Sequence, residues 1–293
     1  MTRRPLRLRR SVLYVPAANG KAVAKSPTLA CDAVIYDLED AVAPAAKEEA
    51  RERLRDHFAA HPESRHERVI RINALSSEYG PEDLLAARAC RPDAILVPKV
   101  DVPAEVADVA DMLAETDAAD AIRLWAMMET PKAILNVARI AEWGETPGSR
   151  LDCLVVGAND LAKDLRLPGP GRDALKPLLM QLVVAARASG LDVIDAVFNA
   201  FRDEGGFAAE CAEAAGMGFD GKTLIHPLQI EPANRAFAIS PEREAEAASI
   251  VAAFDMPENR EVGVINLDGR MVERLHLEDA RRTLALAAMQ RGT

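Results

Sequence analysis

The sequence predicts an α/β fold, a (β/α)8 TIM barrel followed by a C-terminal helical or lid extension. Short β-branched runs recur along the chain, alanine-rich helical stretches alternate with them, and eight such runs fit within about 230 residues. Strict alternation of strand and helix favours a parallel sheet. Sequence patterns do not show whether a sheet closes on itself, so a doubly wound open sheet is the alternative fold.

The predicted strands are short runs that suit burial, and those at 33–36 and 154–156 are continuously apolar, which is typical of strands covered on both faces. The eight strands are expected at 11–15, 33–38, 68–72, 94–98, 121–128, 151–157, 191–197 and 219–225.

Several of the predicted helices begin with a proline near the first turn, where a missing N–H does no harm. They are expected at 44–59, 81–89, 103–115, 131–142, 173–188 and 204–215. After the eighth strand, helices are expected near 241–254 and 277–289, with a short segment at 262–267 and the pair Asp268-Gly269 between them. We therefore expect a barrel catalytic domain over 1–228, then a last barrel helix and C-terminal lid extension over 229–293.

Composition excludes several classes of protein. The chain of 293 residues carries 36 basic and 46 acidic residues and only 4% aromatic residues, which disfavours a nucleic-acid partner. It has no run of 18 apolar residues, so we expect no membrane partner. Its four cysteines form no Cys-x-x-Cys pair, which predicts free thiols in a reducing compartment and a cytoplasmic enzyme.

Five arginines occur among the first ten residues. Such a cluster predicts a solvated basic arm, with phosphate contact as the alternative.

Polar residues stand where the predicted strands end, and in a barrel the carboxyl ends of the strands form the active site. These residues are, in strand order, Asp37, Glu39 and Asp40, then Arg71 and Asn73, then Lys99, Glu129, Asn159 and Asp160, Asp195, Lys222 and His226. One such residue is unremarkable because helix N-caps often lie there, but so many in register indicate a site.

Glu129 and Asp160 are the candidate metal ligands, because each places a hard oxygen donor at the end of one of two adjacent strands. No cysteine or histidine accompanies them, which disfavours zinc, whereas two carboxylates with water and substrate oxygens are typical of magnesium. The alternative is that Glu129 pairs with an arginine or lysine and that Asp160 caps the following helix.

The basic residues at the strand ends have two interpretations. Arg71 could hold a carboxylate or thioester oxygen with two hydrogen bonds, or it could form a salt bridge with Glu39 or Asp40. Lys99 and Lys222 are more often paired than catalytic, and His226, before a proline, could cap the eighth helix or contact substrate.

Several motifs together resemble the HpcH/HpaI aldolase group of CoA-ester lyases, which includes the citrate lyase β subunits. The resemblance spans almost the whole chain, and the Asp-Leu-Glu-Asp and Gly-Lys-x-x-Ile-His-Pro motifs are its most specific parts. The matching segments are RSVLYVP at 10–16, DLED at 37–40, VIRIN at 69–73, LVPK at 96–99, MET at 128–130, GANDL at 157–161, GKTLIHP at 221–227 and LDG at 267–269. Ala17 departs from the family pattern, which has glycine there.

The resemblance implies a magnesium-dependent lyase that cleaves a 3-hydroxyacyl-CoA ester of the citryl-, malyl- or citramalyl-CoA type, usually as a homotrimer. It implies that Glu129 and Asp160 hold Mg²⁺, that Arg71 binds substrate and that Asp268 lies on a lid supplied by a neighbouring subunit. The residues expected to contact the CoA thioester substrate are Arg71, Asn73, Lys99, Tyr14 and Lys21.

The expected reaction is a retro-Claisen cleavage that gives a 2-oxo acid and the enolate of an acyl-CoA. Glu39 or Asp40 is expected to remove the hydroxyl proton, Arg71 to offset the enolate charge, and Asp268 to protonate the carbon. The alternatives are hydrolysis of a malyl-CoA-type thioester, a β subunit active only within a citrate lyase complex, and a barrel that has lost its chemistry. The intact set of Arg71, Glu129, Asp160 and Asp268 disfavours the last.

Overall fold

In the computed structural model, which describes residues 4, 6–116, 121–169 and 171–292, the chain divides into two compact units. Residues 9–236 form the first unit, and residues 237–292, with the described residues among 4–8, form the second. Within the described residues, no helix is both long enough and apolar enough to cross a membrane.

The first unit is a closed parallel barrel, so the predicted fold is confirmed and the open sheet is excluded. Closure comes from the parallel pairing of the first and eighth strands, in which Ser11 lies opposite Lys222 and Leu13 opposite Leu224. The strands, all eight of which were predicted, are β1 (Ser11–Pro16), β2 (Ala33–Asp37), β3 (Glu67–Arg71), β4 (Ala94–Val97), β5 (Arg123–Met128), β6 (Leu151–Val156), β7 (Asp192–Asp195) and β8 (Gly221–Leu224).

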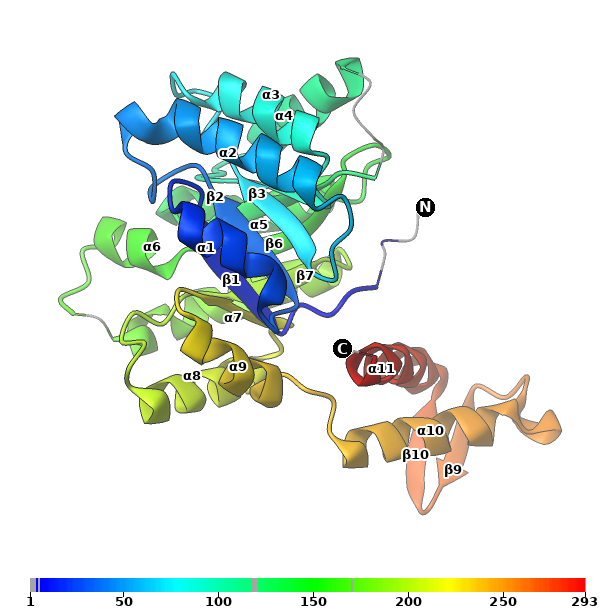
Figure 1. The fold of residues 1–293 in the computed structure, drawn as a ribbon. Coiled ribbons are helices and arrows are strands. Elements are labelled where there is room, and N and C mark those ends of the chain that lie inside the picture. The colour runs from blue at the N-terminus through cyan, green and yellow to red at the C-terminus, as the bar shows by residue number, and fades with distance from the viewer. Residues whose placement is uncertain (1–3, 5, 117–120, 170, 293) are drawn as a thin grey trace. The chain divides into compact units, whose positions relative to one another are not determined.

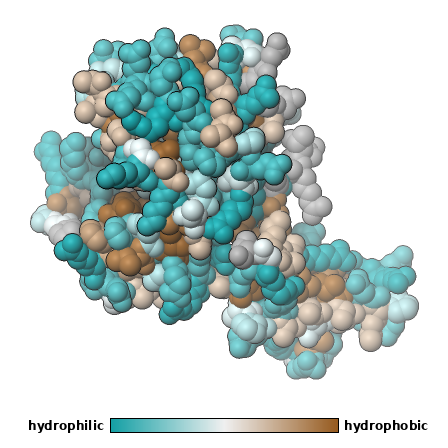
Figure 2. Space-filling view, in the orientation of Figure 1, coloured by the Kyte–Doolittle hydropathy of each residue, from teal (hydrophilic) through white to brown (hydrophobic). Residues whose placement is uncertain are grey.

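Helices surround the strands, with α2, α3 and α4 on one side of the view in Figure 1 and α8 and α9 on the other. They are α1 (Gly20–Lys25), α2 (Lys47–Ala60), α3 (Gly80–Cys90), α4 (Pro103–Glu115), α5 (Pro131–Trp143), α6 (Ala158–Asp164), α7 (Lys176–Ala188), α8 (Glu204–Met217) and α9 (Ile230–Ala236). The six predicted barrel helices are present, and α9 lies where a last barrel helix was expected after residue 228. The short helices α1 and α6 were not predicted. Polar side chains cover most of the face seen in Figure 2, as expected for helices that bury only one side.

Side chains from neighbouring strands fill the barrel interior in layers, as the alternation of a β-strand requires. This core contains Val12, Ala33, Ile35, Val69, Ala94, Leu96, Trp125, Met127, Cys153, Val155 and Ile194. The four cysteines are free and buried, as predicted.

The second unit consists of α10 (Pro241–Asp255), the hairpin strands β9 (Val264–Leu267) and β10 (Arg270–Glu273), and α11 (Arg274–Arg291). Its own small core contains Phe254, Ile265, Val272 and Leu277. Asp268 and Gly269 form the two-residue turn with φ of 50° and 81°, as the Asp-Gly pair of a type I′ hairpin requires. Asp268 is therefore exposed at the tip of a hairpin.

The predicted solvated arm is wrong for Arg9 and Arg10, which are 2% and 7% exposed. Arg9 donates two hydrogen bonds to Glu67, at 2.8 and 2.7 Å, and also pairs with Asp152 and Asp192. The guanidinium lies 4.9 Å from the centre of the Trp125 ring, so it closes the amino-terminal end of the barrel core. Sequence could not show this, because each partner lies at least 58 residues away.

We expect Arg9→Ala to lower the free energy of unfolding by about 3–5 kcal/mol, because it leaves buried carboxylates without their cation. Urea denaturation followed by circular dichroism measures this loss. The control is Arg55→Ala, which removes an exposed ion pair with Glu52 and should cost less than about 1 kcal/mol. Equal effects of the two substitutions would contradict a stabilising role for Arg9.

Candidate active site

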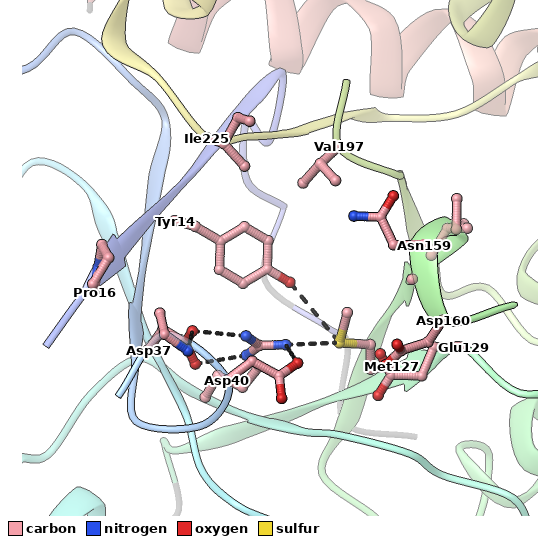
Figure 3. A pocket seen from close by; sticks show the side chains of 15 residues that line it. Tyr14, Pro16, Asp37, Asp40, Met127, Glu129, Asn159, Asp160, Val197 and Ile225 are labelled. Atoms are coloured by element: carbon pink, nitrogen blue, oxygen red, sulfur yellow. Dashed lines mark hydrogen bonds and ion pairs between the residues drawn. The ribbon is translucent and has the colours of Figure 1, made fainter. Parts of the chain in front are cut away.

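A cavity of about 380 Å³ opens at the carboxyl ends of the strands, where the polar strand-end residues predicted a site. Figure 3 shows a guanidinium between a tyrosine ring, an aspartate pair and a second group of carboxylates. The lining residues are Tyr14, Pro16, Asp37, Asp40, Ala41, Arg71, Met127, Glu129, Val156, Gly157, Ala158, Asn159, Asp160, Val197 and Ile225. Five of the predicted site residues, Tyr14, Asp40, Arg71, Glu129 and Asp160, thus meet in one cavity.

Arg71 is the central cation of the cavity and is 7% exposed. Its Nε and Nη2 donate to the two carboxylate oxygens of Asp37, both at 2.7 Å. Its Nη1 lies 2.8 Å from Glu39 Oε2 and 3.9 Å from Asp40 Oδ2. The proposed salt bridge with Glu39 is therefore present, but Asp37 is the main partner, and only Nη1 remains available to a ligand.

Asp37 also shapes the loop that follows β2. Its Oδ1 accepts a hydrogen bond from the backbone N–H of Glu39 at 2.9 Å, and its Oδ2 accepts one from Ala41 at 3.2 Å. The buried Lys47 Nζ donates to the carbonyl oxygens of Leu38 and Glu39, at 2.7 and 3.0 Å. Asp37 and Lys47 thus both hold the Asp-Leu-Glu-Asp loop by hydrogen bonds to its backbone. Asp40, the last residue of the motif, lines the cavity.

The two carboxylates predicted as proton acceptors have different surroundings. Glu39 lies outside the cavity lining and pairs with Arg71 on one oxygen and with Lys99 Nζ, at 3.1 Å, on the other. Burial raises the pKa of Glu39, although Arg71 opposes this shift. Asp40 lines the cavity with a side chain 63% exposed. Asp40 is therefore the solvent-accessible carboxylate of the two, and Glu39 is the one paired with Arg71 and Lys99.

Glu129 and Asp160 lie side by side on one wall of the cavity (Figure 3). Glu129 follows β5, is 1% exposed and accepts a hydrogen bond on Oε1 from the backbone N–H of Lys99 at 2.7 Å. Lys99 has a left-handed backbone with φ of 51° at this point. Burial raises the pKa of Glu129 to about 7, and the nearby carboxylates of Glu39 and Asp160 add to the shift.

The surroundings of Glu129 and Asp160 fit a small divalent cation. In the described chain neither forms a salt bridge with an arginine or lysine, and Asp160 does not cap α6, whose N-cap is Gly157. The described residues place no third His, Cys, Asp or Glu with them to complete a protein-only metal site. Two carboxylates that leave the other positions to water and ligand oxygens match the preference of Mg²⁺.

Gly157 is a site residue that sequence reasoning missed. A β-carbon at this position would lie 2.4 Å from Glu129 Cβ and 2.7 Å from Glu129 Oε2. Both distances are far below van der Waals contact, so glycine is what lets the Glu129 side chain occupy its place. The signal in the sequence is a glycine between an apolar strand and Asn159-Asp160, but the neighbour it accommodates is 28 residues away.

Tyr14 and Met127 form the floor between Arg71 and the acidic wall. The Tyr14 ring centre lies 5.1 Å from the Arg71 guanidinium carbon. The Met127 sulfur accepts from Arg71 Nη1 at 3.7 Å and from the Tyr14 hydroxyl at 3.9 Å. Sequence reasoning did not single out Met127, because an inward-facing methionine on a strand looks like any other core residue.

Three predicted substrate contacts lie outside the cavity lining: Asn73, Lys21 and Lys99, whose Nζ pairs with Glu39. Asn73 donates from Nδ2 to the Leu38 carbonyl at 2.9 Å and to Asp83 at 2.5 Å, which ties the end of β3 to α3. Lys21 is exposed in the first turn of α1. Asn73 is thus held in structural bonds, and a substrate contact by Lys21 remains a prediction.

Lys222 and His226 have structural partners. Lys222 is completely buried, and its Nζ donates to Asp195 at 2.7 Å and to Glu210 at 2.6 Å. His226 caps the short helix that follows it by accepting from the Leu228 N–H, so the predicted cap is confirmed. Both residues hold the end of β8 in place rather than line the cavity.

Comparison with known proteins shows the family to which the chain belongs. Residues 10–227 match the HpcH/HpaI aldolase/citrate lyase family. The chain is 44% identical to a (3S)-malyl-CoA thioesterase of Cereibacter sphaeroides over 95% of this chain and 94% of that protein. It is 33% identical to the mitochondrial citramalyl-CoA lyase of Homo sapiens over 95% of this chain and 85% of that protein.

A solved structure has the same fold. The CitE protein of Mycobacterium tuberculosis, in complex with magnesium, acetoacetate and coenzyme A, superposes with a TM-score of 0.72 at 30% sequence identity. The match covers 95% of this chain and 97% of that one. Family match, relatives and fold agree: the chain belongs to the HpcH/HpaI aldolase/citrate lyase family of enzymes.

Proposed function

We propose that this protein is a magnesium-dependent carbon–carbon lyase that cleaves a 3-hydroxyacyl-CoA ester to an acyl-CoA and a 2-oxo acid. The observation that carries the proposal is the acid pair Glu129 and Asp160, free of salt bridges within the described residues, beside Arg71 in the barrel cavity. The complex of the CitE protein with magnesium and coenzyme A supports both the metal and the class of substrate.

Glu129 and Asp160 would hold Mg²⁺, whose charge would polarise the hydroxyl oxygen that becomes the 2-oxo group. Asp40 lies in the cavity with an exposed carboxylate that can take the hydroxyl proton. Breaking the bond between C2 and C3 of the acyl chain leaves the electron pair on the acyl-CoA as an enolate. Arg71 Nη1, held in place by Asp37 and Glu39, can donate a hydrogen bond to the enolate oxygen.

The enolate carbon then needs a proton, and Asp268 is the proposed donor. It stands at the exposed tip of the β9–β10 hairpin in the second unit, where a short acidic side chain projects from a rigid turn. We propose a homotrimer in which this hairpin acts as the lid of a neighbouring subunit's barrel.

Hydrolysis of a malyl-CoA-type thioester is the second candidate, because the thioesterase relative is 44% identical. The deciding experiment incubates purified protein and Mg²⁺ with malyl-, citramalyl- and citryl-CoA, and follows 2-oxo acid and free thiol separately. Release of 2-oxo acid without thiol supports the lyase. Release of thiol with free hydroxy acid would overturn the lyase in favour of the thioesterase.

We expect Glu129→Gln and Asp160→Asn each to weaken Mg²⁺ binding at least about tenfold, because each removes one charged oxygen ligand. Titration calorimetry on EDTA-treated protein measures the Kd. Asp164→Asn is the matched control, since Asp164 is exposed at the end of the same helix as Asp160. Mg²⁺ binding that is unchanged in both site variants would exclude this pair as the metal site.

We expect Gly157→Ala to weaken Mg²⁺ binding about tenfold, because the new methyl group displaces the Glu129 carboxylate. The same calorimetric titration measures the effect, with circular dichroism to confirm folding. Gly216→Ala is the control, because a β-carbon there meets no atom within 4 Å. A folded Gly157→Ala protein that binds Mg²⁺ like its parent would show that Glu129 is not a ligand.

We expect Arg71→Lys to lower kcat/KM roughly 10- to 150-fold, which corresponds to about 1.5–3 kcal/mol. A lysine carries its N–H groups on a single nitrogen, so it cannot make the two parallel hydrogen bonds to Asp37 and also reach the position of Arg71 Nη1. Steady-state kinetics with the best CoA ester gives the ratio, and Arg55→Lys on the exposed side of α2 is the control. A change within about twofold would make Arg71 a structural residue only.

We expect Asp268→Ala to fold, assemble and bind Mg²⁺ but to lose turnover, because only the proton donor is gone. Mixing it with Arg71→Ala protein under conditions of subunit exchange should restore part of the activity, since some interfaces then combine an intact barrel with an intact hairpin. Exchange shown by mass spectrometry without any recovery would contradict a shared site. Full activity of Asp268→Ala would remove Asp268 from the mechanism.

A further inference from the structure

The Tyr14 hydroxyl is a hydrogen-bond donor of the cavity that has only a weak acceptor. Among the described residues its partner is the Met127 sulfur, 3.9 Å away. A thioether sulfur is a weak acceptor, so this contact stabilises the fold little. The ring of Tyr14 packs against Arg71, with its centre 5.1 Å from the guanidinium carbon, and a phenylalanine ring would do the same. Packing therefore accounts for the ring of Tyr14 but not for its hydroxyl.

Arg71 Nη1 is a second donor directed at the same sulfur. It lies 3.7 Å from Met127 Sδ, while the other two nitrogens of Arg71 donate to Asp37. Nη1 is also 2.8 Å from Glu39 Oε2, but that oxygen accepts no hydrogen bond from the described residues. A charged N–H and a phenolic O–H thus converge on one weak acceptor. Both donors can turn to a ligand oxygen that enters between them, because they give up little in doing so.

The point at which these donors meet lies beside the candidate metal ligands. Figure 3 shows the Tyr14 hydroxyl directed at Met127, with Glu129 and Asp160 next to Met127 on the same wall. An oxygen held by Tyr14 and Arg71 would therefore be a neighbour of a 2-oxo acid bound at the metal site. In the proposed reaction this oxygen is that of the thioester, which receives the electron pair of the broken C–C bond and becomes an enolate.

A neutral donor suits this position because the cavity is rich in negative charge. Four of the lining residues carry a carboxylate: Asp37, Asp40, Glu129 and Asp160. Burial raises the pKa of Tyr14, although Arg71 opposes this shift. The hydroxyl therefore keeps its proton at neutral pH, where it can donate a hydrogen bond without adding a further negative charge.

We propose that the Tyr14 hydroxyl is the second donor of an oxyanion hole, in which it binds the thioester oxygen together with Arg71 Nη1 and stabilises the charge of the enolate. The hydroxyl donates a hydrogen bond and keeps its own proton, while the enolate carbon receives its proton from Asp268. Met127 accepts from both donors until a ligand oxygen takes its place. The inference rests on the proposed lyase function, because that reaction forms the enolate.

The first test measures the binding of two unreactive CoA derivatives that differ by one charge. S-carboxymethyl-CoA ends in a carboxylate that imitates the enolate, and S-acetonyl-CoA ends in a methyl ketone of the same shape. Each is titrated by calorimetry into protein saturated with Mg²⁺ and oxalate, which binds the metal like a 2-oxo acid and cannot react. The parent should prefer the carboxylate, and we expect Tyr14→Phe to reduce this preference at least about fivefold, because a hydrogen bond to a charged group is lost.

Two controls separate the hydroxyl from its surroundings. Tyr79→Phe removes a phenol outside the cavity lining and should leave the preference unchanged. Met127→Leu removes the sulfur but keeps both donors, so the preference should persist. A loss in Met127→Leu as large as that in Tyr14→Phe would mean that the hydroxyl acts only by holding the sulfur. That result, or a folded Tyr14→Phe protein with the parental preference, would overturn the inference and leave the lyase proposal standing. A parent protein that binds neither CoA derivative would overturn the proposed function, and the inference with it.

Steady-state kinetics give an independent measure. With the best CoA ester, we expect Tyr14→Phe to lower kcat roughly 10- to 100-fold and to change KM by less than about threefold, because the hydrogen bond strengthens as the enolate charge develops. A rise in KM with an unchanged kcat would make Tyr14 a residue that only binds substrate and would overturn its role in stabilising the enolate.

Discussion

The ion pair between Asp37 and Arg71 is the interaction on which the arrangement of the cavity depends. The two residues are register partners in the parallel ladder of β2 and β3, so their side chains enter the cavity side by side. Each oxygen of Asp37 accepts one hydrogen bond from Arg71 and one from the loop after β2. The guanidinium and the loop that carries Glu39 and Asp40 therefore share one anchor. A shift of either would leave buried charge uncompensated, which is costly in a low-dielectric interior.

The two ends of the barrel differ in whether their buried carboxylates are paired with a cation. At the amino-terminal end, Arg9 is shared among three carboxylates and stacked against Trp125, and nothing there is left for a ligand. At the carboxyl-terminal end, Arg71 is compensated in the same manner, but Glu129 and Asp160 form no salt bridge with the described chain. Two neighbouring carboxylates without a salt-bridge partner attract a cation. This distinguishes them from the carboxylates around Arg9, whose charge is already compensated by the guanidinium.

Much of the candidate site could be predicted from sequence, because residues at the carboxyl ends of parallel strands must meet. Tyr14, Asp40, Arg71, Glu129 and Asp160 were predicted on this ground or by family resemblance, and all line the cavity. Gly157 and Met127 could not be identified in this way, because their roles depend on contacts with residues distant in the sequence. Gly157 leaves room for Glu129, and Met127 contacts Arg71 and Tyr14. The different surroundings of Glu39 and Asp40 were equally hidden, because adjacent residues of one loop differ here in burial and ion pairing.

By itself the sequence determined the number and order of the barrel strands and the places of the long helices between them. Hydrophobic runs, helix-starting prolines and the Asp-Gly turn act through neighbouring residues. They can therefore be recognised in the sequence without a structure. Only the tertiary structure decided that β1 pairs with β8 to close the sheet, and that Arg9 is a buried plug rather than part of a solvated arm. It also decided that Lys222 is held by Asp195 and Glu210 outside the cavity. These outcomes depend on residues that come together only when distant strands and helices pack. Local sequence patterns do not specify which charged side chains become neighbours.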